Sequence, residues 1–88
     1  MSATTLLERL PKAAERPDAD ALFRLGLRYS TATDGGDIDR VAAHALFELA
    51  AKFGSLEAKV YRHELGDEMD PADVAEAHRL ATAWLTRA

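Results

Sequence analysis

The hydrophobic pattern is most regular between Val41 and Gly54, where the chain reads VAAHALFELAAKFG. Apolar residues recur there at the three- and four-residue spacing of an α-helix, and they form two stripes rather than one. The first stripe contains Ile38, Val41, Ala42, Ala45, Leu46, Leu49 and Phe53, and the second contains Ala43, Phe47, Ala50 and Gly54. A helix with two apolar stripes needs neighbours on two sides. We therefore expect residues 38–53 to form the most buried helix of the chain.

Two further helices are predicted before this stretch. Residues 4–15 have the pattern of a short amphipathic helix, which Pro11 kinks or interrupts. The next helix begins after Asp18 or Asp20 as its N-cap and runs to about Ser30. One face of this helix is formed by Ala21, Leu22, Leu25, Gly26 and Tyr29, while Phe23 and Leu27 lie on the opposite face.

Two more helices are predicted after the central one. Ser55 is a suitable N-cap for a helix that continues to about Leu65 and is ended by Gly66. Asp70 then caps the last helix, with Pro71 at its first position. The apolar face of the last helix contains Val74, Ala77, His78, Ala81, Trp84 and Leu85. The pattern as a whole predicts an all-α fold of about five helices, the last four of which form two antiparallel pairs.

Composition and charge narrow the classes of partner. The 88 residues allow one domain, and the excess of Asp and Glu (15) over Lys and Arg (11) gives a net charge of −4. This charge disfavours nucleic acid, since binding to a phosphate backbone relies on positive charge. The chain contains no cysteine and no apolar run of membrane-spanning length, so we expect no membrane contact and a cytoplasmic location.

The two helix pairs can be aligned with each other, because Ala21 corresponds to Ala58 and Val41 to Val74. Helix–turn–helix units at this period indicate tetratricopeptide-like repeats. The aligned residues resemble the Sel-one-like repeat family. The resemblance rests on Ala21, Leu25-Gly26, Tyr29, Gly35-Gly36, Asp39, Ala43, the run Ala50-Ala51-Lys52-Phe53-Gly54, Ala58, Arg62, Leu65, Met69-Asp70-Pro71, the run from Ala75 to Ala81, and Trp84.

The resemblance implies a fragment of an α/α superhelix that serves as a scaffold for protein interactions. It divides the single domain 1–88 into an N-terminal helix (1–17), one full repeat (18–54) and a terminal repeat (55–88). The partner would be another protein, with a homodimer through the open repeat ends as a second option.

Residues with catalytic or metal-binding chemistry are not arranged in a recognisable motif. His44, His63 and His78 fall on three different predicted helices, and none has a second histidine four residues away. We expect them to be structural or surface residues, with His78 half-buried on an apolar face. The acidic residues around residues 64–76 are typical of helix caps and a solvated face. We therefore expect no enzyme, no catalytic or metal site and no cofactor.

Three residues are predicted to have structural roles. Arg62 lies on the same face as Ala58 and Leu65, so its guanidinium is expected to meet a carboxylate, either Glu76 or Asp73. An alternative role for Arg62 is to anchor an anionic group of a partner. Trp84 is expected to pack near Leu80 and the preceding helix, at the end of the core.

The opposite face of the helix at residues 18–30 is the candidate partner site. Phe23 and Leu27 are expected to lie outside the repeat core, flanked by Arg24 and Arg28. Either the N-terminal helix covers them with Leu6, Leu7 and Leu10, or they form an apolar patch with a basic rim that binds an acidic amphipathic helix.

The sequence thus favours a non-enzymatic protein-interaction module, a small adaptor or scaffold. A small helical regulator or ligand-binding domain is the alternative.

Overall fold

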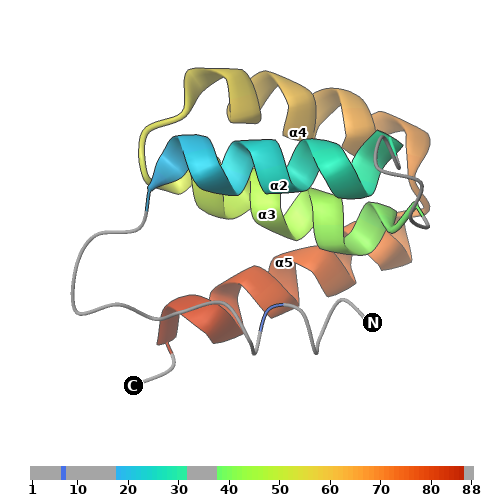
Figure 1. Cartoon of the computed structure of the whole chain (residues 1–88). Coiled ribbons are helices and arrows are strands. Elements are labelled where there is room, and N and C mark those ends of the chain that lie inside the picture. Colours follow the sequence, from blue (N-terminus) through green and yellow to red (C-terminus); the bar gives the residue numbers. More distant parts are fainter. Residues whose placement is uncertain (1–6, 8–17, 32–37, 87–88) are drawn as a thin grey trace.

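The helix α3 (Arg40–Lys52) lies at the centre of the molecule, with the other helices arranged around it (Figure 1). The computed structural model describes residues 7, 18–31 and 38–86. Within these residues the chain forms α2 (Ala19–Thr31), α3, α4 (Leu56–Glu68) and α5 (Pro71–Thr86). The predicted helix at residues 4–15 lies outside the described residues, except for Leu7. The all-α prediction is confirmed, with four described helices rather than five.

Both ends of α3 are set by local sequence. The carboxylate of Asp39 accepts a hydrogen bond from the backbone N–H of Ala42 at 3.0 Å, which makes Asp39 the N-cap. At the other end, Phe53 is the C-cap and Gly54 follows with a φ of 114°. This left-handed conformation is available to glycine at little cost, so Gly54 ends the helix as the sequence predicts.

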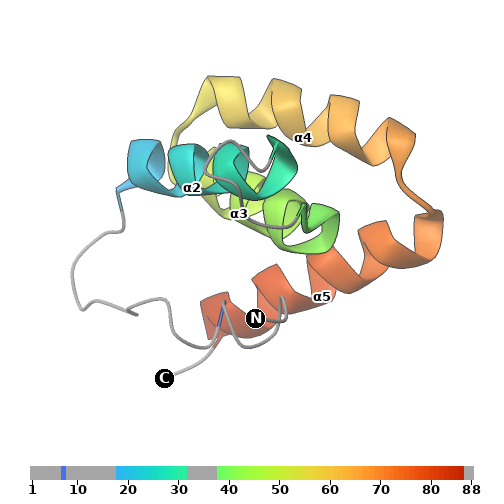
Figure 2. The same ribbon diagram turned by 45° about the vertical axis from the view of Figure 1, so that its right-hand side comes forward.

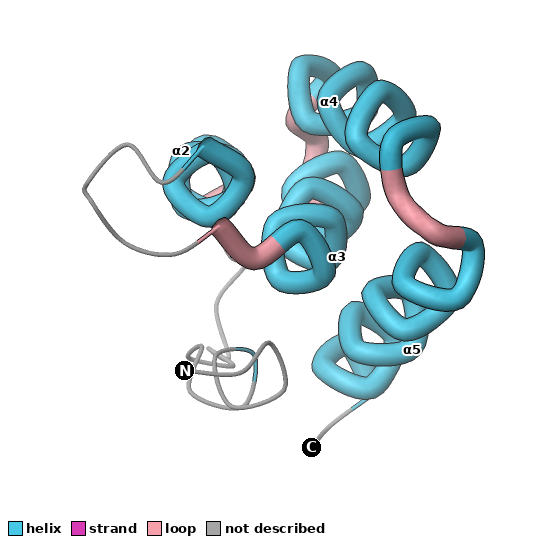
Figure 3. Tube along the Cα trace, turned by 90° about the vertical axis from the view of Figure 1, so that its right-hand side faces the viewer, coloured by secondary structure: helices cyan, strands magenta, loops and turns pink. Residues whose placement is uncertain are grey.

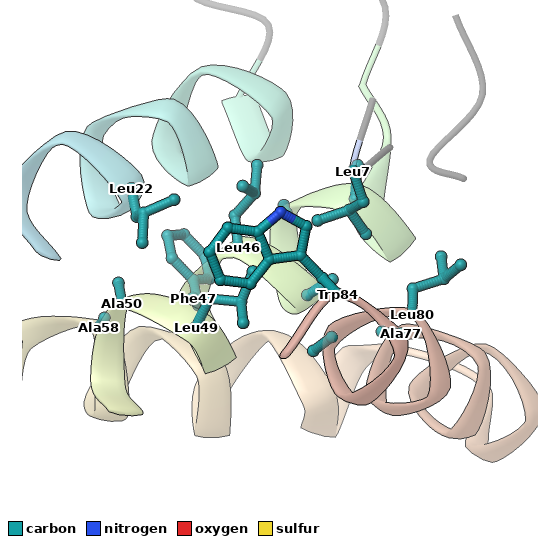
Figure 4. Close-up of a cluster of buried hydrophobic side chains, with 14 of the residues drawn as sticks. Leu7, Leu22, Leu46, Phe47, Leu49, Ala50, Ala58, Ala77, Leu80 and Trp84 are labelled. Atoms are coloured by element: carbon teal, nitrogen blue, oxygen red, sulfur yellow. The ribbon is translucent and has the colours of Figure 1, made fainter. Parts of the chain in front are cut away.

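The core is built on α3. Leu46, Phe47, Leu49 and the first four alanines of α3 are almost completely buried, as are Leu22, Ala58, Ala77, Leu80 and Trp84 from the surrounding helices (Figure 4). The prediction of a central helix with neighbours on several sides is confirmed. Ile38 is the exception, because it precedes the helix and its side chain is 52% exposed.

The helix α2 packs closely along one side of α3. The carboxylate of Asp18 accepts from the backbone N–H of Asp20 at 3.0 Å and so caps the helix, as one of the two predicted options. Gly26 faces Phe47 so closely that a β-carbon at this position would lie 2.6 Å from the ring. The small residue therefore lets the two helices approach, and they run antiparallel as predicted (Figure 1).

The helix α4 begins as expected but ends later. The hydroxyl of Ser55 accepts from the backbone N–H of Ala58 at 3.1 Å, which confirms Ser55 as the N-cap. The prediction that Gly66 ends the helix is wrong, because α4 continues to Glu68 and Met69 is the C-cap. Gly66 lies instead beside the imidazole of His44 on α3, where a β-carbon would be 3.3 Å from Nε2. This glycine serves a close contact between helices rather than a turn.

The helix α5 begins at Pro71, as predicted, and closes one end of the core. Trp84 is buried and its ring lies edge-on to Phe53, with the ring centroids 6.3 Å apart. Its observed ring partner thus comes from the end of α3 rather than from the preceding helix. Leu7 is buried in the same cluster and lies toward Trp84 in Figure 4.

The second predicted helix pair is not formed as a packed pair. Both α4 and α5 pack against α3, but they make few contacts with each other and diverge from their connecting turn (Figures 2 and 3). The side chains between them are largely polar, as described below, and cannot replace an apolar interface. Of the four described helices, none combines the length and hydropathy needed to cross a bilayer.

Candidate functional site

Two adjoining pockets lie between α4 and α5, with α3 at their base. Their volumes are about 390 and 350 Å³, and Glu48 and Arg62 line both of them, so the two pockets lie next to each other. We call the two together the α4–α5 groove. The first pocket is lined by Glu48, Ala51, Lys52, Lys59, Arg62, His78, Thr82 and Leu85, and the second by His44, Glu48, Arg62, His63, Gly66, Asp67 and Val74.

A bond between Glu48 and His78 spans the base of the groove from α3 to α5. The Nδ1 atom of His78 lies 2.8 Å from a carboxylate oxygen of Glu48. The Glu48 side chain is only 18% exposed, whereas that of His78 is 70% exposed. The prediction that His78 is a half-buried core residue is therefore wrong. Its position on α5 faces the groove rather than the apolar contact with α3.

The basic residues of the groove come from two helices. Lys52 lies in the last turn of α3, while Lys59 and Arg62 lie on α4. Within the part of the chain that the structure describes, none of the three forms an ion pair. Arg62 is half-buried, whereas Lys52 and Lys59 are exposed.

His44 is the buried polar residue at the base of the second pocket. It is 5% exposed, and its Nδ1 atom has no hydrogen-bond partner among the described residues. Burial lowers the pKa of His44, and the charges of Arg62 and His78 lower it further, while Glu48 acts in the opposite direction. Burial therefore favours the neutral form of His44. Gly66 leaves room for its ring against α4.

The third histidine lies at the rim. Nε2 of His63 is 3.7 Å from a carboxylate oxygen of Asp67, one turn along α4, and both side chains are well exposed. In residues 7, 18–31 and 38–86, no three His, Cys, Asp or Glu side chains are grouped as a metal ion would require.

The predicted partners of Arg62 are not beside it. Glu76 instead bonds to Arg79, three residues along α5, with 3.0 Å between one pair of their atoms. This bond to Arg79 lowers the pKa of Glu76. No ion pair joins Arg62 to Glu76 or Asp73 among the described side chains. The prediction of a structural ion pair is wrong, and Arg62 faces the groove instead.

The predicted partner site on α2 has a different surface from the expected one. Phe23 is buried, because its ring contacts Phe47 at 5.8 Å and Tyr61 at 5.1 Å between centroids. The assumption that the helix core cannot cover this face is therefore wrong, since Tyr61 of α4 covers Phe23. Leu27 is half-buried and Arg28 is exposed.

Arg24, the remaining member of that predicted site, is also exposed, but its guanidinium forms an ion pair with Asp20 on the same helix. Of the residues predicted to cover Phe23, Leu6 and Leu10 lie outside the described part of the chain.

Most residues of the groove were not predicted from the sequence, although the sequence of the central helix contains a pattern that indicates them. His44, Glu48 and Lys52 recur every four residues on the central helix, so they form a polar stripe beside its apolar ones. A polar stripe on a helix that is otherwise buried marks the side where packing is incomplete. The two apolar stripes predicted the sides of α3 that pack against other helices. The polar stripe has the same four-residue spacing, and it identifies the side of α3 that faces the α4–α5 groove.

No protein-family model matches this sequence, and comparisons with the curated proteins and with the solved structures give no significant match.

Proposed function

We propose that this chain is a non-enzymatic protein-interaction module, an adaptor or scaffold, and that its α4–α5 groove holds a segment of a partner protein. The observation that carries the proposal is the divergence of α4 and α5 over α3. Three helices turn polar side chains toward a shared depression instead of closing it with apolar contacts. Such a depression offers hydrogen-bonding and charged groups in fixed positions to a chain that lies along it.

The lining supports a peptide segment as the occupant. Ala51 and Leu85 contribute apolar surface next to the charged residues of the first pocket. Recognition sites for protein segments commonly combine apolar contacts with a polar rim. A small-molecule ligand in the same groove is the second candidate, and the separate volume of the first pocket, about 390 Å³, is of a suitable size for one.

The repeat arrangement of residues 18–54 and 55–88 remains part of the proposal. The resemblance to Sel-one-like repeats implies a superhelix fragment with a scaffolding role, and a cytoplasmic location suits that role. In such a fragment the groove between the last two helices would supply the interaction surface, and self-association would use the open ends of the fragment.

Filling the groove tests this proposal. A Thr82→Trp substitution places a large ring on α5 at a lining position, while Ala83→Trp adds the same ring at the next residue, which is exposed and lines neither pocket. We expect affinity capture followed by mass spectrometry to recover the same partner with the wild type and Ala83→Trp, and to lose it with Thr82→Trp.

Circular dichroism and thermal unfolding verify that both variants keep the helical fold. Equal recovery of that partner by both tryptophan variants would place the binding surface elsewhere. Light scattering of the same samples detects a self-associated form, which the Thr82→Trp variant should leave unchanged if the repeat ends mediate it.

A further inference from the structure

The charge of the first pocket of the α4–α5 groove is opposite in sign to that of the whole chain. The first pocket contains Lys52, Lys59 and Arg62 but only one carboxylate, that of Glu48. The chain as a whole carries a net charge of −4. The first pocket therefore concentrates positive charge on an acidic molecule, whereas the second holds the carboxylates of Glu48 and Asp67 beside Arg62. A concave surface of one sign attracts ligands of the other sign.

The single carboxylate of the first pocket does not neutralise its three cations. A carboxylate oxygen of Glu48 lies 2.8 Å from Nδ1 of His78, so this group is already bonded across the groove. Elsewhere in the described chain, Arg24 pairs with Asp20 and Arg79 with Glu76. The three groove cations differ from those arginines, because no described carboxylate lies within ion-pair distance of them.

We infer that the segment held in the α4–α5 groove is acidic, with Glu or Asp side chains that meet Lys52, Lys59 and Arg62. This inference rests on the proposed function and specifies the chemistry of the partner. Arg62 is the half-buried cation shared by both pockets, so it takes the central carboxylate, while the more exposed Lys52 and Lys59 attract acidic residues at one end of the groove. Apolar side chains of the segment meet Ala51 and Leu85.

A protein segment fits this surface better than a nucleic acid does. Nucleic-acid binding requires a basic surface that follows many phosphates, and the acidic balance of the chain opposes it. In the groove, positive charge is confined to a few side chains beside apolar ones. An acidic segment with interspersed leucines matches both features, whereas a phosphate backbone matches only the first.

The probe for this inference is a fluorescein-labelled peptide of alternating Glu, Asp and Leu residues, with a matched peptide in which Gln and Asn replace the acids. We expect fluorescence anisotropy to detect binding of the acidic peptide to the full chain and much weaker binding of the amide peptide. Arg62→Gln and Lys59→Gln should each weaken binding by about tenfold, since each removes a charge-assisted contact.

Arg24→Gln is the matched control, because it removes the same charge from α2 and should change the affinity by less than about twofold. Lys59 is exposed, so its variant reports on binding even if Arg62→Gln lowers stability. Inorganic phosphate serves as a competitor. It should displace the acidic peptide only at concentrations where a simple salt of the same ionic strength does so too.

The inference would be overturned by no binding of the acidic peptide, by equal loss of affinity in Arg24→Gln and Lys59→Gln, or by full displacement by low phosphate concentrations. Equal affinity for the acidic and amide peptides, together with loss of both in Thr82→Trp, would overturn the acidic preference while supporting the groove as a peptide site. Unchanged binding in Thr82→Trp would instead contradict the proposed function itself.

Discussion

The two sides of α3 differ in how completely they are packed. On the α2 side, Gly26 brings the helices so close that Phe47 fills the space where a side chain would lie, and the contact is apolar. On the other side, α4 and α5 separate, and Glu48 faces the groove between them. The same helix is therefore the centre of the core on one side and the base of a polar depression on the other.

This difference indicates that the two sides of α3 have different roles, one in stability and the other in binding. Apolar burial supplies most of the free energy of folding, and here it is concentrated on the apolar stripes of α3. The polar stripe of His44, Glu48 and Lys52 adds little apolar area to that burial, although His44 itself is buried at the base of the second pocket. We expect changes on the packed side to alter stability and changes in the groove to alter binding.

The largest effect on stability is expected for Leu49→Ala. Leu49 is completely buried, so its truncation should lower the free energy of unfolding by about 2–5 kcal/mol through lost burial and a cavity. Chemical denaturation measures this change. Leu56→Ala is the matched control on α4, because Leu56 is 80% exposed and its loss should cost less than about 0.5 kcal/mol. A cost below that value at Leu49 would reject the assigned core.

A smaller loss is expected for Gly26→Ala. The added methyl group would lie 2.6 Å from the buried ring of Phe47, so one of the two helices must shift. We expect a net loss of about 1–3 kcal/mol from overpacking, even though alanine favours the helix by about 1 kcal/mol. Urea denaturation tests it. An unchanged or increased stability would mean that α2 is not tightly packed on α3.

On the groove side of α3, protonation of His44 should make the free energy of unfolding depend on pH. Because burial lowers its pKa in the folded state, the unfolded chain binds more protons below about pH 6.5. The contribution of neutral His44 is therefore complete above that pH and is lost as the pH falls toward the lowered value. A comparison with a variant isolates the contribution of His44.

His44→Gln should reduce the loss of stability between about pH 7 and pH 5, because it removes this titrating group. His63→Gln makes the same substitution at an exposed side chain and should keep the wild-type dependence. Thermal unfolding at a series of pH values distinguishes the two variants. If His44→Gln and the wild type lost stability equally over this pH range, His44 would not be the cause of the loss.

The smallest effect is expected for Gly66→Ala. Its β-carbon would lie 3.3 Å from Nε2 of His44, a contact that a shift of a few tenths of an ångström relieves. The adjoining groove gives the imidazole room to move, and alanine favours the helix, so stability should change by less than about 1 kcal/mol in either direction. A loss as large as that of Gly26→Ala would mean that the two sides of α3 are equally rigid.

The sequence predicted the packed half of the molecule better than the open half. The helix signals at Asp18, Ser55, Gly54 and Pro71 were local, so the pattern of caps and stripes was sufficient to place them. Gly66 was misread because its close contact with His44 depends on a neighbouring helix rather than on the local chain. Phe23 and His78 were misplaced for a similar reason.

Whether Phe23 and His78 are buried depends on where a neighbouring helix lies, and that geometry is a tertiary property. Phe23 is covered by Tyr61, thirty-eight positions later in the chain, and His78 bonds to Glu48 across the groove. Helical periodicity gives the direction of a side chain relative to its own helix, but it does not say whether another helix is present on that side.

The most direct test of the account is an NMR titration of the isotope-labelled full chain with the acidic peptide. We expect the amide shift changes to concentrate around Glu48, Arg62 and Thr82, on the three helices that form the groove. Shift changes concentrated instead around Phe23 and Leu27 on α2, or spread evenly over the surface, would contradict the account.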